Sequence, residues 1–239
     1  MAGEQHTPAI EVRGLSRFFG RTVALDNVSF TAAPGEAFFC LGGNGAGKST
    51  LLSILAGVLA PTEGELRLLG EQARRRGPAL RSAIGYAGAQ PQLYKDFSIE
   101  ESLLFFAAMY GVDRKEARTN ELITDFGLDA HRNKRLKECS QGIIRKAALA
   151  RALLHFPKLL LLDEPFTHLD VAAKRDLLVV LRKQKAFGTT LVVSSHEEDL
   201  VQALADRAIL LRDGRVVRSL SRGELAGFSF EAVVGADSC

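Results

Sequence analysis

Short, almost wholly apolar runs alternate along the chain with longer segments in which apolar residues recur at helical spacing. The runs predict strands buried on both faces of a parallel sheet, because such strands carry few polar side chains. They are Ala37–Leu41, Leu159–Leu162 and Thr190–Ser194. The helical segments lie at about 47–57 and 171–187, and a further helix is expected to begin near Ser195. Alternating strands and helices predict an α/β domain.

The two ends of the chain depart from this alternation. Short runs of strand-forming residues separated by turn sequences predict a small antiparallel sheet near the N-terminus. These runs are Ile10–Val12, Val28–Phe30 and Glu65–Leu69. Near the C-terminus, Ile209–Leu211 and Arg215–Val217 flank Asp213-Gly214 and predict a hairpin. The sequence holds no internal repeat and no low-complexity linker, so residues 1–239 are predicted to form a single domain with a frayed tail over 228–239.

The central part of the chain is helical in character. Ser98 and Glu101 form the pattern of a capping box, and Asp113 with Glu116 predicts the start of a second helix. A third helix is expected to begin near Ser140. We therefore predict a helical subdomain at about residues 93–156.

Composition and charge narrow the class of protein. The chain has 239 residues, of which 46% are hydrophobic and 25% charged, as in soluble globular proteins. Its net charge of +3 is too small to indicate a nucleic-acid partner. No stretch approaches the roughly 20 apolar residues needed to cross a bilayer, and no secretory signal is visible, so a cytoplasmic location is expected. The three cysteines, Cys40, Cys139 and Cys239, are too widely spaced to indicate a metal site or a disulfide framework.

A glycine-rich segment directly follows the first apolar run and matches the P-loop or Walker A pattern. Glycine permits backbone angles at which consecutive N–H groups turn inward around a β-phosphate. Lys48 then places a cation between the β- and γ-phosphates, and Ser49 is placed to bind Mg²⁺. The candidate nucleotide-binding residues are Gly42, Gly43, Asn44, Gly45, Ala46, Gly47, Lys48, Ser49 and Thr50. A glycine-rich turn before an ordinary helix is the alternative.

Two carboxylates follow the second apolar run, and a histidine follows the third. Asp163 and Glu164 form a Walker B pattern, which places both acids at the carboxyl edge of a parallel strand. Asp163 is expected to hold the hydration shell of Mg²⁺ beside Ser49, and Glu164 to orient and deprotonate the water that attacks the γ-phosphorus. A helix N-cap cluster is the alternative for this pair. His196 can reach the γ-phosphate from the same edge, although a lone histidine is more often structural.

The order of the motifs points to a known family. Walker A is followed by Cys139-Ser140-Gln141-Gly142-Ile143, by Walker B, by Phe166-Thr167-His168-Leu169-Asp170 and then by His196. In this order the chain resembles the nucleotide-binding subunit of an ABC transporter over about residues 10–225. The resemblance implies a P-loop NTPase of ABC type that binds ATP. It also implies a RecA-like core with a small antiparallel β subdomain and a helical subdomain.

The resemblance assigns roles to residues outside the two Walker motifs. Phe19 is identified with an aromatic residue that stacks on adenine, although it could instead belong to the core. Ser140 and Gly142 are identified with positions that touch the γ-phosphate held by a second subunit. Ser140 also sits at a predicted helix N-terminus, which favours an anion, and a simple N-cap is its alternative role. The resemblance thus implies a head-to-tail dimer with a second copy or a paralogue, with two ATP sites.

Two positions depart from the family's pattern. Ala89 stands where most members have a glutamine, and alanine cannot bind Mg²⁺ or hold the attacking water. Either the loop shifts so that Gln90 serves as the metal ligand, which we favour, or metal coordination and communication with the permease are weakened. Gly43 stands where the family commonly has proline, and this leaves the loop less constrained.

The resemblance implies an ATPase in which Lys48, Glu164 and His196 carry out hydrolysis. Closure and opening of the dimer would drive a separate membrane permease, which holds the chain at the inner face of the cell membrane. The segments 86–91 and 163–167 are more similar to the ATPase of the cytochrome c maturation haem exporter than to importers, so we expect an exporter, haem-exporter-like or generic. A non-transport ABC ATPase, such as an Fe–S assembly ATPase acting with a soluble scaffold, is the alternative.

Overall fold

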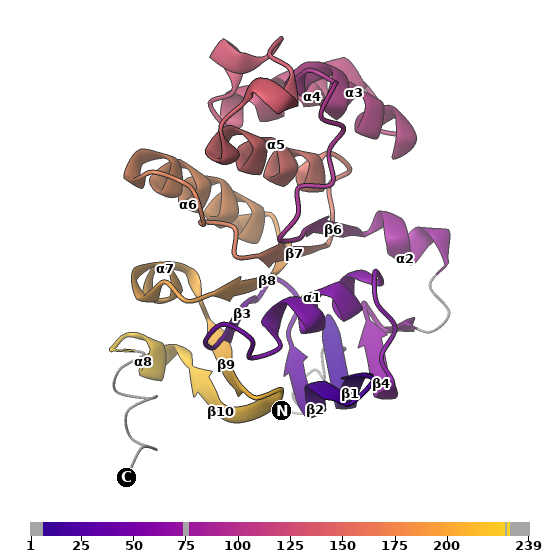
Figure 1. Cartoon of the computed structure of the whole chain (residues 1–239), viewed down its shortest axis with the longest axis vertical. Coiled ribbons are helices and arrows are strands. Elements are labelled where there is room, and N and C mark those ends of the chain that lie inside the picture. The colour runs from indigo at the N-terminus through magenta and orange to yellow at the C-terminus, as the bar shows by residue number, and fades with distance from the viewer. Residues whose placement is uncertain (1–6, 74–76, 228, 230–239) are drawn as a thin grey trace, which may run out of the picture.

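The apolar runs of the sequence form the centre of the larger of two sheets. The computed structural model describes residues 7–73, 77–227 and 229 (Figure 1). The larger sheet has six strands, in the spatial order β10 (Arg215–Ser221), β9 (Arg207–Arg212), β3 (Ala37–Leu41), β8 (Thr190–Ser195), β7 (Leu159–Asp163) and β6 (Ile84–Ala87). Strands β9 to β6 in this order run parallel to one another, and β10 is antiparallel to β9. The predicted α/β domain and C-terminal hairpin are confirmed.

Both faces of this sheet are buried, because alternate side chains of its strands belong to two different hydrophobic clusters. In β3, Phe39 and Leu41 pack into one cluster, and Phe38 and Cys40 pack into the other. Every residue of β3, β7 and β8 is buried, which explains why these segments read as continuous apolar runs. The first cluster takes in most of the helices, and the second takes in α1 (Lys48–Ala56) and the smaller sheet.

The smaller sheet is antiparallel, as the sequence predicts. Its strands lie in the order β2 (Thr22–Ala32), β1 (Ile10–Phe19), β4 (Glu63–Leu68) and β5 (Glu71–Gln72). Its side chains pack against the larger sheet, and the rings of Phe30 and Phe38 stack with centroids 4.8 Å apart. Figure 1 shows this sheet at one end of the molecule.

A helical lobe occupies the opposite end of the molecule in Figure 1. It contains α3 (Ile99–Met109), α4 (Lys115–Asp125) and α5 (Gln141–Leu153), with 3₁₀ turns at Asp129–His131 and Leu136–Glu138. The capping box of Ser98 and Glu101 is present. The predicted cap at Asp113 is wrong, because the residue before α4 is Arg114, which has a left-handed φ of 50° and makes no side-chain cap hydrogen bond. The lobe leaves the sheet after β6, its edge strand, and returns at β7, the neighbouring strand.

The remaining helices are short connectors or cover the larger sheet. They are α2 (Pro78–Ser82), α6 (Val171–Ala186), α7 (Glu198–Leu204) and α8 (Arg222–Leu225). Helix α7 begins three residues later than expected, because the Ser195 hydroxyl accepts a hydrogen bond from the Glu197 N–H at 3.0 Å and holds the chain in a turn. His196 therefore lies in a loop.

The structure tests two further predictions only over the residues that it describes. No helix within the described residues is long and apolar enough to cross a membrane. Of the predicted tail over 228–239 only Ser229 is described, so the expected fraying and Cys239 lie outside the described residues.

Candidate nucleotide site

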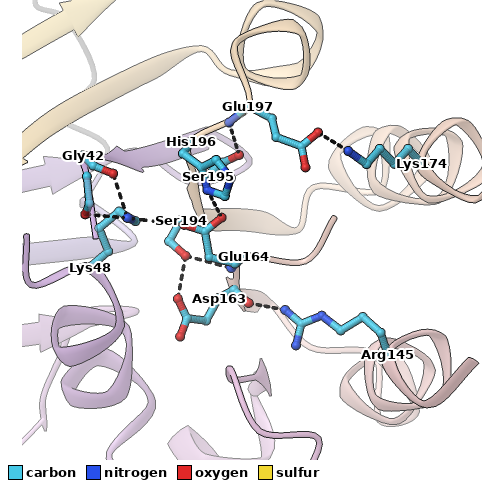
Figure 2. Close-up of polar contacts among 11 residues, drawn as sticks. Gly42, Lys48, Arg145, Asp163, Glu164, Lys174, Ser194, Ser195, His196 and Glu197 are labelled. Atoms are coloured by element: carbon cyan, nitrogen blue, oxygen red, sulfur yellow. Dashed lines mark hydrogen bonds and ion pairs between the residues drawn. The ribbon is translucent and has the colours of Figure 1, made fainter. Parts of the chain in front are cut away.

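Three adjacent parallel strands bring the motifs to one edge of the larger sheet. Strand β3 leads into the P-loop and α1, β7 ends at Asp163, and β8 ends one residue before His196. Leu41 pairs with Ser195 and Asp163 pairs with Ser194, so the three strand ends lie level with one another. Figure 2 shows their side chains converging. This is the edge at which open α/β sheets bind ligands.

The P-loop backbone explains why glycine occupies particular positions. Gly47 has a φ of 103°, and a Cβ there would lie 2.6 Å from the Ala24 carbonyl oxygen. A Cβ on Gly42 would lie 2.4 Å from the Leu211 carbonyl oxygen. At Gly43, by contrast, no atom lies within 4 Å of the Cβ position. The loop ends at the N-terminus of α1, whose free N–H groups and dipole favour an anion.

Lys48 is almost fully buried at the first position of α1, with 6% of its surface exposed. Its ammonium donates hydrogen bonds to the carbonyl oxygens of Gly42, at 2.7 Å, and Gly43, at 3.0 Å. It also lies 3.3 Å from Oε1 of Glu164. The ammonium therefore lies at the mouth of the loop, where a phosphate group can replace the Glu164 carboxylate as its partner.

Glu164 stands at the centre of the candidate catalytic group. Its Oε2 atom lies 2.9 Å from Nδ1 of His196, and its backbone N–H donates to the Ser194 hydroxyl at 2.8 Å. Its φ of 47° is uncommon for a residue with a side chain and sets it apart from the extended strand before it. The structure thus brings together all three predicted catalytic residues, Lys48, Glu164 and His196 (Figure 2).

Asp163 has the features of a cation ligand. It is 1% exposed, and its Oδ1 atom accepts a hydrogen bond from the Ser194 hydroxyl at 2.6 Å. Its Oδ2 atom is buried and has no hydrogen-bond partner within the described residues. A buried carboxylate oxygen without a partner is costly unless something binds it, and Mg²⁺ prefers oxygen ligands. The site therefore fits a phosphate–Mg²⁺ pair, with Ser49 next to Lys48 at the start of α1.

A cavity of about 310 Å³ lies beside these groups. It is lined by Asn44, Ala89, Pro91, Gln141, Arg145, Asp163, Glu164, Thr167, His168 and His196. Ala89 faces this cavity, whereas Gln90 is exposed and is absent from its described lining. A metal-binding role for Gln90 would require the loop to change conformation, and that role stays a prediction.

Sequence reasoning missed two polar residues of the site. Ser194 is fully buried and connects the side chain of Asp163 to the backbone of Glu164. Arg145, 7% exposed, donates from Nη1 to the Gly88 carbonyl at 2.7 Å and from Nη2 to the Asp163 carbonyl. Burial lowers the pKa of Arg145, and the charges of Asp163 and Glu164 oppose this shift. Two features of the sequence could have indicated these residues. They are the serine at the end of the predicted strand Thr190–Ser194 and the arginine that directly follows two isoleucines.

The residues assigned by resemblance lie outside the cavity lining. Phe19 is 46% exposed at the end of β1, and the Arg17 guanidinium lies 4.5 Å from its ring centroid. Ser140 is exposed and caps α5, its hydroxyl accepting from the Ile143 N–H at 3.4 Å. A Cβ on Gly142 would lie 2.8 Å from the His168 carbonyl oxygen. The ring of Phe19 faces solvent and Ser140 is exposed at the N-terminus of α5, so both residues can contact a ligand or a second chain.

Comparison with known proteins agrees with this geometry. Residues 25–167 match the protein family described as ABC transporter. The Nod factor export ATP-binding protein I of Paraburkholderia xenovorans (strain LB400) is 35% identical over 211 residues, which are 87% of this chain and 69% of that protein. The ABC transporter ATP-binding protein NatA of Bacillus subtilis (strain 168) is 35% identical over 197 residues, or 81% and 80% of the two chains.

Two solved structures share the fold over nearly the whole chain. An ATP-binding subunit of an ABC transporter has a TM-score of 0.85 at 29% identity, covering 96% of this chain and 99% of that one. A dimeric ATP-binding cassette in a post-hydrolysis state, bound to ADP and Pi, has a TM-score of 0.82 at 26% identity, covering 92% and 100%.

Proposed function

Because this chain belongs to the ABC transporter family as an ATP-binding subunit, we propose that it hydrolyses ATP within a head-to-tail dimer and thereby drives export through a separate membrane permease. The observation that carries the catalytic part is the contact chain from Lys48 through Glu164 to His196, beside a buried Asp163 oxygen without a partner.

Each residue of this group has a distinct task. Lys48 binds the terminal phosphates once they displace the Glu164 carboxylate from its ammonium. Glu164, released at Oε1, accepts a hydrogen bond from the attacking water and takes its proton. His196 holds the other carboxylate oxygen through Nδ1 and fixes the direction in which Glu164 points. Asp163 and Ser49 would hold Mg²⁺, which when bound neutralises charge on the phosphates.

The remaining contacts to nucleotide come from Phe19 and from a second chain. Phe19 exposes enough of its ring to stack on a base. Ser140 and Gly142 lie outside the cavity of their own chain and would close the nucleotide site of the partner. The dimeric arrangement of the similar cassette supports this part of the proposal.

The permease is proposed to dock where the loop after β6 meets the helical lobe, near residues 90–97. Tyr94 is 53% exposed and Phe105 38% exposed, and their rings lie 5.4 Å apart. This leaves an aromatic surface beside the loop that reaches the nucleotide site. Export is proposed because several similar proteins are named Nod factor export proteins. The cargo would be chosen by the permease, and this docking would place the chain at the inner face of the membrane.

Two measurements test the proposal. Phosphate release and binding of a fluorescent ATP analogue compare the unmodified chain with Lys48→Ala, which is expected to weaken triphosphate binding. Equal binding by the variant would contradict the assignment of Lys48. Affinity purification from membranes solubilised in mild detergent is expected to recover a polytopic permease. Recovery of a soluble scaffold alone would replace transport by the Fe–S assembly alternative.

A further inference from the structure

The loop between β6 and the helical lobe approaches the nucleotide cavity without a polar side chain. Ala89 and Pro91 line the cavity, and the Gln90 side chain lies outside its described lining. A methyl group and a proline ring cannot accept or donate a hydrogen bond. Any response of this loop to a bound phosphate must therefore travel through other groups.

Arg145 connects this loop directly to the strand that carries the acids. One arm of its guanidinium holds the Gly88 carbonyl at 2.7 Å, and the other holds the Asp163 carbonyl. The side chain is 7% exposed and itself lines the cavity. A buried planar guanidinium with two fixed partners is a rigid connector, since moving either carbonyl alone breaks a charge-assisted hydrogen bond.

Arg151, further along α5, also contacts the backbone around this loop. Its Nη2 donates to the Tyr86 carbonyl at 2.9 Å and its Nη1 donates to the Gln92 carbonyl at 3.0 Å. Helix α5 thus fixes the backbone just before the loop 88–92 and at both of its ends. Of these two arginines, it is Arg145 that also reaches the strand end at Asp163.

We propose that Arg145 is a positioning residue that couples occupancy of the nucleotide site to the loop 88–92, in place of a side chain at position 89. This inference rests on the proposed function, since it takes a nucleotide to occupy the site. Phosphate binding withdraws Lys48 from Glu164, the residue next to Asp163, so the strand end shifts. The Arg145 fork passes that shift to Gly88 and so toward the aromatic surface at Tyr94.

The test uses a fluorescence reporter in the full chain. The sequence contains no tryptophan, so Tyr94→Trp introduces the only indole. Addition of MgATP to this reporter chain is expected to change the indole emission. Adding Arg145→Met is expected to reduce that change at least about threefold when MgATP is added at a concentration that saturates the site of each variant. Lys146→Met, which removes a charge from the next position on α5, is the matched control and is expected to keep the full change.

Four results would overturn the inference. One is a full emission change in the Arg145→Met reporter, and another is loss of the change in the Lys146→Met control. A third is loss of the change in a Gln90→Ala reporter, which would show that Gln90 turns inward and acts as the link. The fourth is an unmodified reporter that binds nucleotide without any change in emission. Absence of nucleotide binding in the unmodified chain would instead reject the proposed function itself.

Two further measurements test the inference if the Arg145→Met variant fails to fold. Arg145→Lys keeps the charge but cannot hold two carbonyls as a planar fork, so it is expected to lose the emission change at a saturating concentration of MgATP. Hydrogen exchange of the unmodified chain needs no variant. MgATP is expected to change the exchange of peptides covering 86–92, and unchanged exchange there would contradict the coupling.

Discussion

The Oε2 atom of Glu164 lies 2.9 Å from Nδ1 of His196. The histidine side chain is 57% exposed, whereas the carboxylate is 23% exposed, so the histidine lies on the solvent side. The contact holds one oxygen of the carboxylate, while the other oxygen lies 3.3 Å from the Lys48 ammonium. In the proposed mechanism, Glu164 therefore separates from Lys48 while it keeps its contact with His196.

The first prediction concerns Glu164→Gln. The amide keeps the size of the side chain but cannot accept the proton of the attacking water, so ATP binding should persist while turnover falls about 100-fold or more. The dimer should also persist longer with MgATP. Phosphate release and size-exclusion chromatography measure the two effects.

Glu197→Gln is the matched control, because Glu197 pairs with Lys174 outside the proposed catalytic group. Its turnover should stay near that of the unmodified chain. Equal turnover in the two variants would remove Glu164 from its assigned role.

The second prediction compares two glycines of the P-loop. Gly47→Ala places a Cβ 2.6 Å from the Ala24 carbonyl at a φ of 103°, so the loop must distort and ATP affinity should fall at least about tenfold. Gly43→Ala meets no atom within 4 Å and should bind ATP nearly normally. Isothermal titration with MgATP distinguishes them. A normal affinity in Gly47→Ala would show that phosphate binding does not depend on this backbone conformation.

The third prediction concerns Cys40. Burial in β3, with a further contribution from the charge of Asp163, raises the pKa of the Cys40 thiol to about 12. Thiolate is the reactive form, so iodoacetamide at pH 8.5 should leave Cys40 unmodified in the folded protein and modify it after unfolding in urea. Peptide mass spectrometry identifies the modified residue. Rapid alkylation of Cys40 under native conditions would contradict its placement in the sheet.

The fourth prediction is a pH dependence of stability. Burial lowers the pKa of His155, and the charges of Arg151 and Arg118 act in the same direction, although the bond to the Ile84 carbonyl opposes them. The unfolded chain therefore binds a proton at higher pH than the folded chain does. The free energy of unfolding should be highest above about pH 6.5 and should fall as pH drops below it.

Urea unfolding at pH 7.5 and pH 5.5 measures this loss of stability. His155→Gln keeps a donor for the Ile84 carbonyl but does not titrate, so it should reduce the difference between the two midpoints. An unchanged difference would show that other groups cause the acid sensitivity.

Most of the central architecture could be predicted because local pattern and burial agree there. The runs at β3, β7 and β8 are apolar throughout, since both faces of the sheet are covered. The glycines of the P-loop follow from backbone angles that only glycine adopts readily. The relative placement of Lys48, Glu164 and His196 follows from parallel strands that end at one edge.

The parts that could not be predicted depend on contacts between segments distant in sequence. Strand β6 was missed because it contains Gly85, yet a Cβ at that position would lie 2.2 Å from the Ala152 carbonyl oxygen of α5. The role of Arg145 depends on carbonyls 57 and 18 positions away in the chain. The haem-exporter resemblance drawn from segments 86–91 and 163–167 remains a prediction, since the similar proteins named above carry other names.

The helical lobe is attached to the larger sheet through β6 and β7, at the sheet's outer margin. Because β6 and β7 are parallel, the chain leaves for the lobe at the carboxyl end of β6 and returns at the amino end of β7, so the two connections lie at opposite ends of these strands. The lobe also shares one hydrophobic cluster with β3, β7 and β8. A movement of the lobe would therefore strain side-chain contacts in that cluster and carbonyl contacts such as those of Arg145, rather than the backbone pairing between β3, β8 and β7.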